Sequence, residues 1–428
     1  MPLRCLPPLR LFGALGSSGT ATSWKGWSMI AIGPVHGGEA AQDRQEPRVL
    51  FLSTYPPTIC GLATFTEALM GGLTVHRGTS LGMGVVGVAA YGDSPEVEGD
   101  SAIARVVPGA PGWVDIVAAV SVDYDVLVIQ HEYGIYGADD GIALLDLLEA
   151  VTVPVVTTIH SVPIEPTPRQ RVILETLVER SAVAVLISTA ARRFLIEGYR
   201  VDPSKLMVIP HGAHVFAEPV VSADPRPLVL TWGLLGPGKG IQWGILAMDR
   251  LRHLRPQPRY LVQGETHPAV LRREGEAYRN RLRALVADNG LEDMVRIQGG
   301  YLSIPDLAKV VSSANIVLLP YDSRDQVASG VLVEAIAAGK PVVATSFPHA
   351  VELLAGGIGR VVRHEDPDSI AEGLLSLLKD PQAVAAAAEA ARRLTPVLAW
   401  GTVAQRYDEA FRTVAARDRS KRSGSRPA

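Results

Sequence analysis

The segment 329–345, SGVLVEAIAAGKPVVAT, contains an apolar helical pattern that carries a single acid, Glu334. The expected helix begins at Ser329 and Gly330, and the backbone N–H groups of a first helical turn have no intrahelical partner. Together with the helix dipole, these groups favour an anion such as phosphate. A carboxylate on an apolar helix is costly to bury unless it is paired, and Glu334 could accept two hydroxyl hydrogen bonds from a ribose. The segment therefore predicts a nucleotide-binding site.

A glycine-rich loop at residues 234–242, LLGPGKGIQ, offers a second anion site. It follows an expected strand, and Lys239 stands where the next helix begins. Free amides, the helix dipole and an ammonium group all favour a negative charge there. The alternative is a Gly-Pro turn with a surface lysine, and a P-loop is excluded because G-x-x-x-x-G-K-[ST] is absent. Two anion sites and a suitable acid predict a bound nucleoside diphosphate.

Histidines follow three expected strands in the first half of the chain, at His131, His160 and His211. Gly61 follows another strand at the expected start of a helix, where a glycine lets a ligand approach free N–H groups. In open parallel α/β sheets, ligands bind beyond the carboxyl ends of the strands. A single histidine is more often packed or exposed than catalytic, but three that converge favour a reacting site.

Other motif matches have simpler explanations. Residues 82–87, GMGVVG, match a dinucleotide fingerprint, but residues 85–90 are themselves the expected strand, and no helix begins at the glycines. Asp123 and Asp125 have the spacing of a metal-binding acidic pair, but they precede a strand, where a turn favours aspartate. His131-Glu132 lacks the second histidine of a zinc helix, and no residues of the sequence have metal-ligand spacing. The sequence therefore predicts no metal site.

Alternating strand and helix patterns must position these residues. The strands are continuous apolar runs, typical of parallel sheets that helices cover on both faces. They are expected at 48–53, 84–92, 125–131, 153–160, 182–188 and 205–210, and again at 228–233, 259–264, 294–299, 315–321, 341–345 and 359–363. A polar, proline-rich stretch at 222–227 separates the two sets. The predicted fold class is α/β, with two Rossmann-like doubly wound parallel sheets. The expected parts are an N-terminal domain at 48–222, a C-terminal domain at 228–398 and a last helix at 399–416.

The composition suits two such domains. The 428 residues are 47% apolar and 20% charged with a net charge of −3, so a large core is available and no basic surface for nucleic acid is predicted. Two cysteines are too few for a disulfide framework, and no apolar run could span a membrane, which favours a cytoplasmic protein. Residues 1–47 are expected to be a disordered leader. Residues 417–428 are expected to be a basic disordered tail that could contact anionic lipid at the inner membrane face.

Several of these segments resemble one enzyme family. PGKG and SGVLVEAIAAGKPVVAT are similar to the phosphate loop and to the C-terminal part of the E-x7-E motif of family 4 glycosyltransferases, while HEYG, TTIH and CGLATF fit that family's N-terminal half. The resemblance covers residues 48–416. It implies the GT-B fold, in which two Rossmann-like domains face a cleft and the last helix crosses back to the first domain.

The resemblance also implies an activity. The implied activity is the transfer of a hexose from a nucleoside-diphosphate sugar, GDP- or UDP-linked. The transfer would retain the configuration of the sugar and would need neither a metal ion nor a cofactor. The C-terminal domain would bind mainly the donor. The N-terminal domain would bind mainly the acceptor, which could be a glycan, a lipid or a small molecule.

The family's site residues carry over to matching positions of this sequence. Gly61 would lie near the donor phosphates and sugar, and His160 would face the reacting sugar. Lys239 would neutralise the departing diphosphate, and Glu334 would hold the ribose. Phosphate and sugar oxygens would bind the backbone of three successive residues, Ser329, Gly330 and Val331.

Two positions depart from the family pattern. The family's usual arginine, five residues before the lysine, is Leu234, and the first glutamate of E-x7-E is Gln326. Both changes remove charge near the reacting centre. Three outcomes follow for Gln326: its amide positions the donor, Asp325 takes over the acidic role, or the site is inactive. We expect the first, because Ser329, Gly330 and Glu334 still match a working donor site.

Two other functions stay open. One is a nucleotide-sugar-binding protein without transferase activity, which the two departures make conceivable. The other is a different enzyme on the same fold. An epimerase needs no separate acceptor, and a phosphorylase of this fold needs pyridoxal phosphate.

Overall fold

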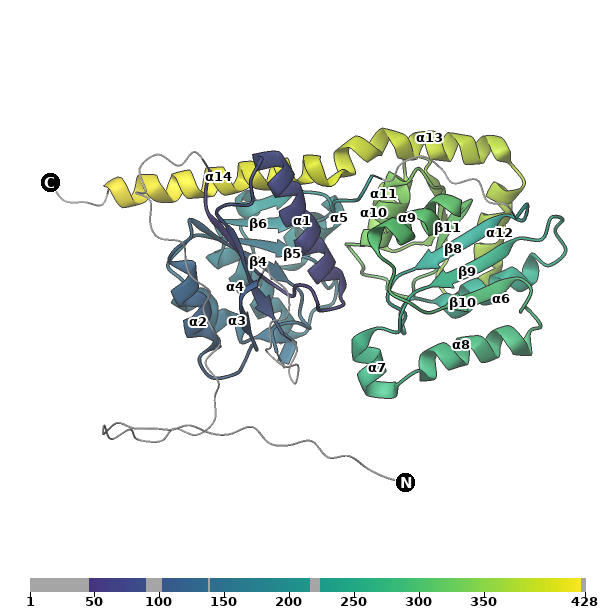
Figure 1. Ribbon diagram of the computed structural model, residues 1–428, viewed down its shortest axis with the longest axis horizontal. Coiled ribbons are helices and arrows are strands. Elements are labelled where there is room, and N and C mark those ends of the chain that lie inside the picture. The colour runs from purple at the N-terminus through teal and green to yellow at the C-terminus, as the bar shows by residue number, and fades with distance from the viewer. Residues whose placement is uncertain (1–45, 90–101, 138, 216–223, 425–428) are drawn as a thin grey trace, which may run out of the picture. The chain divides into compact units, whose positions relative to one another are not determined.

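The computed structural model describes residues 46–89, 102–137, 139–215 and 224–424, and these belong to one compact unit. They form two α/β domains, each with a parallel sheet between helices (Figure 1). The expected fold class is confirmed. The expected domain bounds, 48–222 and 228–398, stay a prediction, and residues 222–223 of the expected linker lie outside the described residues.

The first domain is built on a seven-stranded sheet with the order β3-β2-β1-β4-β5-β6-β7, all parallel. The strands are β1 Val49–Ser53, β2 Met83–Val88, β3 Ala102–Val106, β4 Val126–His131, β5 Val155–Ile159, β6 Val183–Leu186 and β7 Leu206–Val208. The helices are α1 Gly61–Arg77, α2 Trp113–Ser121, α3 Leu144–Ala150, α4 Pro168–Arg180 and α5 Thr189–Gly198, with short 3-10 turns at Asp139–Gly141 and Pro203–Lys205. The sequence patterns missed β3, whose first two residues are only partly buried at the sheet edge.

Both faces of this sheet are covered, which explains its uninterrupted apolar strands. Leu50 and Leu52 point into one core cluster, and Val49 and Phe51 point into the other. All five residues of β1 are fully buried. Because successive strand side chains alternate between faces, a strand buried on both sides needs apolar residues throughout.

The second domain is built on a six-stranded parallel sheet with the order β10-β9-β8-β11-β12-β13. The strands are β8 Leu228–Trp232, β9 Arg259–Gln263, β10 Val295–Gln298, β11 Ile316–Leu319, β12 Val342–Thr345 and β13 Gly359–Val362. The helices are α6 Ile241–Arg250, α7 Pro268–Glu274, α8 Ala277–Asp288, α9 Ile304–Ser313, α10 Gly330–Ala337, α11 Pro348–Leu354, α12 Pro367–Leu378 and α13 Pro381–Leu398. In each sheet the strand order reverses beside the first strand, which places a crevice at the carboxyl ends of the central strands.

The last helix, α14 (Trp400–Gly424), returns to the first domain and lies along α1 (Figure 1). Tyr407 and Phe411 are fully buried in the cluster that covers β1. The Phe411 ring meets Phe51 edge-on at 6.2 Å, and the Tyr407 hydroxyl lies 3.2 Å from that of Thr158. The expected crossover helix is therefore confirmed. No helix in the described part of the chain is both long and apolar enough to cross a bilayer.

Two expectations about the chain ends are corrected. The helix does not stop at 416, because α14 continues through Gly424 and only 425–428 of the expected tail lie outside the described residues. Its charged side chains suit a helix, and Arg422 pairs with Asp418 one turn earlier at 2.6 Å. At the other end, 1–45 lie outside the described residues, but the last two residues of the expected leader are anchored. The Glu46 carboxylate pairs with Arg412 at 2.6 Å, and the Pro47 carbonyl accepts from Arg77.

Candidate functional site

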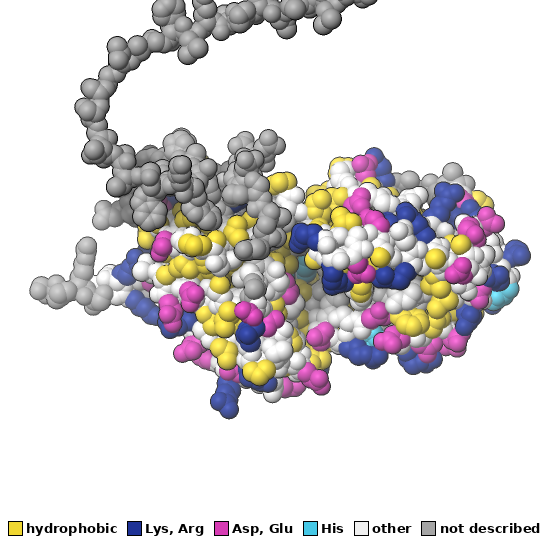
Figure 2. All heavy atoms as spheres, turned by 90° about the horizontal axis from the view of Figure 1, so that it is seen from below, with side chains coloured by type: hydrophobic (Ala, Val, Ile, Leu, Met, Phe, Trp, Pro, Cys, Tyr) yellow, Lys and Arg dark blue, Asp and Glu magenta, His cyan; other side chains and the backbone are white. Residues whose placement is uncertain are grey.

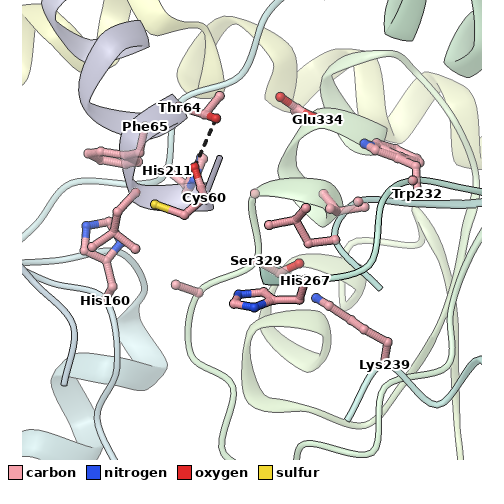
Figure 3. A pocket seen from close by; sticks show the side chains of 18 of the residues that line it. Cys60, Thr64, Phe65, His160, His211, Trp232, Lys239, His267, Ser329 and Glu334 are labelled. Carbon is pink, nitrogen blue, oxygen red and sulfur yellow. Dashed lines mark hydrogen bonds between the residues drawn. The ribbon is translucent and has the colours of Figure 1, made fainter. Parts of the chain in front are cut away.

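A cavity of about 970 Å³ opens where the carboxyl ends of the two sheets meet, and residues of both domains line it. Seen from below, the surface between the domains is hollowed, with acidic and basic side chains interspersed around it (Figure 2). All the site residues expected from the sequence line this one cavity: Gly61, His160, Lys239, Gln326, Ser329, Gly330, Val331 and Glu334. Figure 3 shows the cavity with residues of the first domain on one side and of the second on the other.

Lys239 lies in the loop between β8 and α6, where both of its neighbours, Gly238 and Gly240, have a positive φ. Gly240 has a φ of +59°, and a Cβ there would lie 1.7 Å from the Pro320 carbonyl oxygen. The loop can therefore approach β11 only with a glycine at this position. The ammonium nitrogen of Lys239 stands 4.2 Å from the centre of the Tyr321 ring. In the described part of the chain it forms no ion pair with a carboxylate, so its charge is available to an anion.

The start of α10 provides backbone donors, but not the ones that the sequence predicted. The Ser329 N–H donates to Nδ1 of His349 at 3.0 Å, so the expectation that this N–H is free is wrong. The Ser329 hydroxyl oxygen caps the helix by accepting from the Leu332 N–H. Within the described residues, the N–H groups of Gly330 and Val331 have no acceptor in the protein. Two backbone donors, rather than three, are thus available at this helix end.

Glu334 lies on the next turn of α10 and faces the same cavity (Figure 3). One of its carboxylate oxygens is 3.7 Å from Nδ1 of His214. Because Glu334 lies beside the cavity and next to the His214 imidazole, its carboxylate avoids the cost of an unpaired buried charge. It keeps acceptor capacity for hydroxyl groups of a ligand.

Gln326 and Asp325 both line the cavity, so the loop bends enough to present two neighbouring side chains. The Gln326 amide nitrogen donates to the Ala328 carbonyl at 3.0 Å, which leaves the side-chain oxygen available as an acceptor. Asp325 is exposed and receives a hydrogen bond from Ser323. Leu234, at the other departure from the family pattern, also lines the cavity and adds an apolar surface.

The first-domain wall presents His160 at the end of β5. Its Nε2 lies 2.8 Å from the Gln130 side-chain oxygen, and the Phe65 ring meets it edge-on at 4.8 Å. Burial lowers the pKa of His160 to about 3, and the neighbouring His211 and His131 add to this shift. The imidazole is therefore neutral near neutral pH and can exchange hydrogen bonds without carrying charge.

Only two of the three histidines at strand ends reach the cavity. His211 lines it, while His131 is packed behind it against Tyr133 and Tyr136. Burial lowers the pKa of His131 to about 3, and its Nδ1 has no hydrogen-bond partner among the described atoms. The expected convergence of three histidines is wrong for His131, because its side chain faces the core of the sheet.

Gly61 is the first residue of α1, where Cys60 caps the helix. A Cβ added at Gly61 would meet no protein atom within 4 Å, so the space before this helix end is open. In the described structure the N–H groups of Gly61 and Leu62 lack a protein acceptor. A second helix start therefore faces the cavity from the opposite wall.

Other lining residues were not identified from the sequence. The hydroxyl groups of Thr64 and Tyr301 lie 3.1 Å apart and join α1 to the segment after β10. Glu132, which belongs to the HEYG segment but was not predicted as a site residue, lines the cavity next to Ser161. Both Tyr301 and Glu132 follow strand ends, so the rule applied to the histidines could have found them.

The described residues also bear on metal binding. Among them, no group of three His, Cys, Asp or Glu side chains is placed to hold a metal ion. The positively charged side chain on the cavity wall is that of Lys239.

Comparison with known proteins extends these observations. Residues 216–394 match the family model of glycosyl transferases group 1. The chain is 30% identical over 290 residues to a D-inositol 3-phosphate glycosyltransferase of Kineococcus radiotolerans, a match that covers 61% of this chain and 64% of that protein. It is 28% identical over 280 residues to a phosphatidyl-myo-inositol mannosyltransferase of Mycolicibacterium smegmatis, covering 62% of this chain and 67% of that one.

Solved structures support the same fold. Sucrose-phosphate synthase from Thermosynechococcus elongatus superposes with a TM-score of 0.70 at 19% identity, over 86% of this chain and 99% of that one. Anabaena HepE, solved with UDP-glucose, gives a TM-score of 0.67 at 18% identity, over 85% and 99% of the two chains. These similarities establish the two-domain GT-B fold.

Proposed function

The chain belongs, through residues 216–394, to the group 1 glycosyl transferases, and from this premise we propose that it transfers a hexose from a nucleoside-diphosphate sugar to an acceptor. Transfer would retain the configuration of the sugar and need no metal ion. One observation carries the proposal. Within the described structure, an ammonium group without a carboxylate partner, N–H groups without an acceptor at a helix start and a carboxylate gather on one wall of a cavity, and the opposite wall carries a neutral imidazole.

The second domain would hold the donor. Lys239 and the N–H groups of Gly330 and Val331 would bind the diphosphate, and Glu334 would accept hydroxyl hydrogen bonds from the ribose. A departing nucleoside diphosphate gains negative charge, which preorganised donors stabilise. Each charge-assisted hydrogen bond contributes roughly 1.5–3 kcal/mol. The lysine would thus supply the neutralising charge that a divalent cation supplies in metal-dependent transfer.

The first domain would hold the acceptor and complete the reacting centre. His160 is neutral, so it would interact with sugar hydroxyls by hydrogen bonds and would not repel the positive charge that grows on the sugar ring. Retention would follow from departure and attack on one face of the ring, with the leaving phosphate accepting the proton of the acceptor hydroxyl. In this scheme the side-chain oxygen of Gln326 would position a hydroxyl of the donor sugar.

The relatives support the substrate classes. Anabaena HepE was solved with UDP-glucose, and two relatives are named for transfer to inositol phosphate or to phosphatidyl-myo-inositol. We take the donor of this chain to be UDP- or GDP-linked and the acceptor to be a glycan, a lipid or a small molecule. The chain would work in the cytoplasm, and the basic end of α14 could contact the inner membrane face at about 1 kcal/mol per cationic side chain.

A binding panel followed by turnover tests the proposal. The protein is mixed with UDP-glucose, GDP-mannose and other nucleotide sugars, and the unfolding temperature is measured with and without EDTA. A ligand at about 100 times its dissociation constant adds roughly 2.7 kcal/mol of stability. Release of nucleoside diphosphate is then measured with the best donor. If no nucleotide sugar binds, the proposal is wrong.

A second candidate function is nucleotide-sugar binding without transfer. The observation that favours it is the loss of two charges at the cavity, where Leu234 and Gln326 stand. A donor that binds but is neither hydrolysed nor transferred with any acceptor would favour this candidate. Release of diphosphate above the uncatalysed rate would exclude it.

A further inference from the structure

The charged side chains that line the cavity are mostly acidic. Lys239 is the one lysine or arginine among the lining residues of the described chain, and it belongs to the second domain. The first-domain lining residues, here called the acceptor wall, include two acids, Glu67 and Glu132. The buried Arg105 of β3 donates to the Pro56 carbonyl at 2.6 Å and is not among the lining residues. The acceptor wall therefore carries negative side-chain charge and no arginine or lysine within the described structure.

Glu132 is held firmly in this wall. It follows β4, and one carboxylate oxygen accepts from the Ser161 hydroxyl while the other accepts from the Tyr133 N–H at 3.0 Å. Ser161 is the residue after His160, so Glu132 lies next to the histidine that would face the reacting sugar. Each carboxylate oxygen has a second lone-pair site, which lets Glu132 accept a further hydrogen bond from a ligand.

Among the described residues of the acceptor wall, no lysine or arginine offsets the negative charge of Glu132. Burial lowers the pKa of His160 and of His211 on the acceptor wall, which disfavours a positive charge on either imidazole. Burial raises the pKa of Glu132, whereas the hydrogen bonds from the Ser161 hydroxyl and the Tyr133 N–H favour its carboxylate form and oppose this shift. The negative charge of Asp325, across the cavity, adds to the effect of burial. The internal segments outside the described residues, 90–101 and 216–223, contain no lysine or arginine in their sequences.

We infer that the acceptor of this enzyme is a hydroxyl-bearing group with no phosphate near its reacting hydroxyl, and that Glu132 accepts a hydrogen bond from another of its hydroxyls. The inference rests on the proposed function and names the substrate class of the same cavity. A hydroxyl group donates to a carboxylate, whereas a phosphate dianion next to Glu132 and Asp325 is repelled and finds no arginine or lysine on the acceptor wall. Glu132 is thus a specificity residue for the acceptor.

The acceptor inferred for this chain differs from the one named for a relative. The Kineococcus relative is named for an inositol phosphate acceptor, which needs positive charge close to the phosphate. The match to that relative covers only 64% of its length, so acceptor chemistry does not carry over with the family. The acceptor wall of this chain favours the uncharged member of any pair of acceptors that differ by one phosphate.

Matched acceptor pairs test the inference. With a donor that binds, release of nucleoside diphosphate is measured against glucose and its phosphate ester, fructose and its phosphate ester, and myo-inositol and its monophosphate. Each compound is scored by the concentration at which it half-maximally stimulates or inhibits donor turnover. We expect the uncharged member of the most effective pair to act at a concentration at least about tenfold lower. Equal or better action by the phosphate ester would overturn the inference, as would no response to any uncharged member at tens of millimolar.

A charge-neutral variant provides a second test. Glu132→Gln keeps the size of the side chain and removes its charge, so we expect the phosphate esters to gain several-fold relative to their uncharged partners. Glu179→Gln, an exposed acid on α4 away from the cavity, is the matched control and should leave the ratio unchanged. An unchanged ratio in Glu132→Gln contradicts the assigned role. Donor binding distinguishes the two proposals: if no nucleotide sugar binds, the proposed function fails, whereas a bound donor with preferred phosphate esters refutes only this inference.

Discussion

Nε2 of His160 lies 2.8 Å from the side-chain oxygen of Gln130, which is buried beside it on β4. Because an amide oxygen only accepts, Nε2 of the neutral imidazole carries the proton and Nδ1 keeps its lone pair. Gln130 thus fixes the tautomer of the residue that would face the reacting sugar.

We expect His160→Ala to lower turnover much more than donor affinity, because the ring faces the acceptor side and the phosphate-binding groups lie on the opposite wall. Turnover and nucleoside diphosphate binding of this variant should be measured side by side. His131→Ala is the comparison, since His131 does not line the cavity and its loss should reduce stability more than turnover. Normal turnover in His160→Ala would remove that residue from the reacting centre.

Replacing Lys239 by alanine should weaken binding of nucleoside diphosphate by tenfold or more, which is about 1.4 kcal/mol. The side chain fills no core and its ammonium has only the Tyr321 ring as a described partner, so stability should change little. Lys309→Ala, an exposed lysine on α9, is the matched control and should bind normally. Full affinity in Lys239→Ala would mean that the loop is a simple turn.

Gln326→Ala should reduce turnover by tenfold or more, about 1.4 kcal/mol in activation free energy. Asp325→Asn should reduce it less, because Asp325 is the exposed member of the pair and lies toward Glu132. Turnover of the best donor is measured for wild type and both variants. A larger loss in Asp325→Asn would move the acidic role by one residue.

Stability should fall as the solution is acidified from about pH 6.5 to about pH 3. Burial lowers the pKa of His131, His160 and His349 to about 3 in the folded protein, from the ordinary value of 6.5. Below pH 6.5 the unfolded chain therefore binds more protons, and each histidine removes up to about 1.4 kcal/mol per pH unit. The raised pKa of Glu132 acts in the opposite sense, because the folded state takes up that proton first.

Urea denaturation at several pH values measures this slope. His349→Gln should flatten it, and should also disturb the helix start, because Nδ1 of His349 accepts the Ser329 N–H. A slope that is the same in wild type and variant would show that His349 does not titrate between the two pH limits.

Gly240→Ala should destabilise the protein by at least about 1–3 kcal/mol, because the new Cβ would overlap the Pro320 carbonyl at a positive φ. Gly356→Ala is the control, since no protein atom lies within 4 Å of a Cβ there. Thermal unfolding of both variants checks the difference. Equal stability would mean that the loop can move away from β11 without cost.

The sequence predicted the fold well because parallel strands buried on both faces are continuous apolar runs. It missed β3, where Arg105 interrupts the run at the edge of the sheet. It predicted which segments form the site, since carboxyl ends of parallel strands meet at one edge. Which N–H groups are free depends on residues distant in the chain. The Ser329 N–H is occupied by His349, twenty residues later, and no local pattern shows that contact.

The return of α14 has a consequence for biosynthesis. The core that covers β1 contains Tyr407 and Phe411, which leave the ribosome only after the second domain has been translated. Domains usually fold in the order in which they are synthesised. Here the N-terminal domain lacks one wall of its core until the last helix is released, so the first domain to be translated is the last to be finished. During translation the apolar face that α14 covers would be open to chaperones.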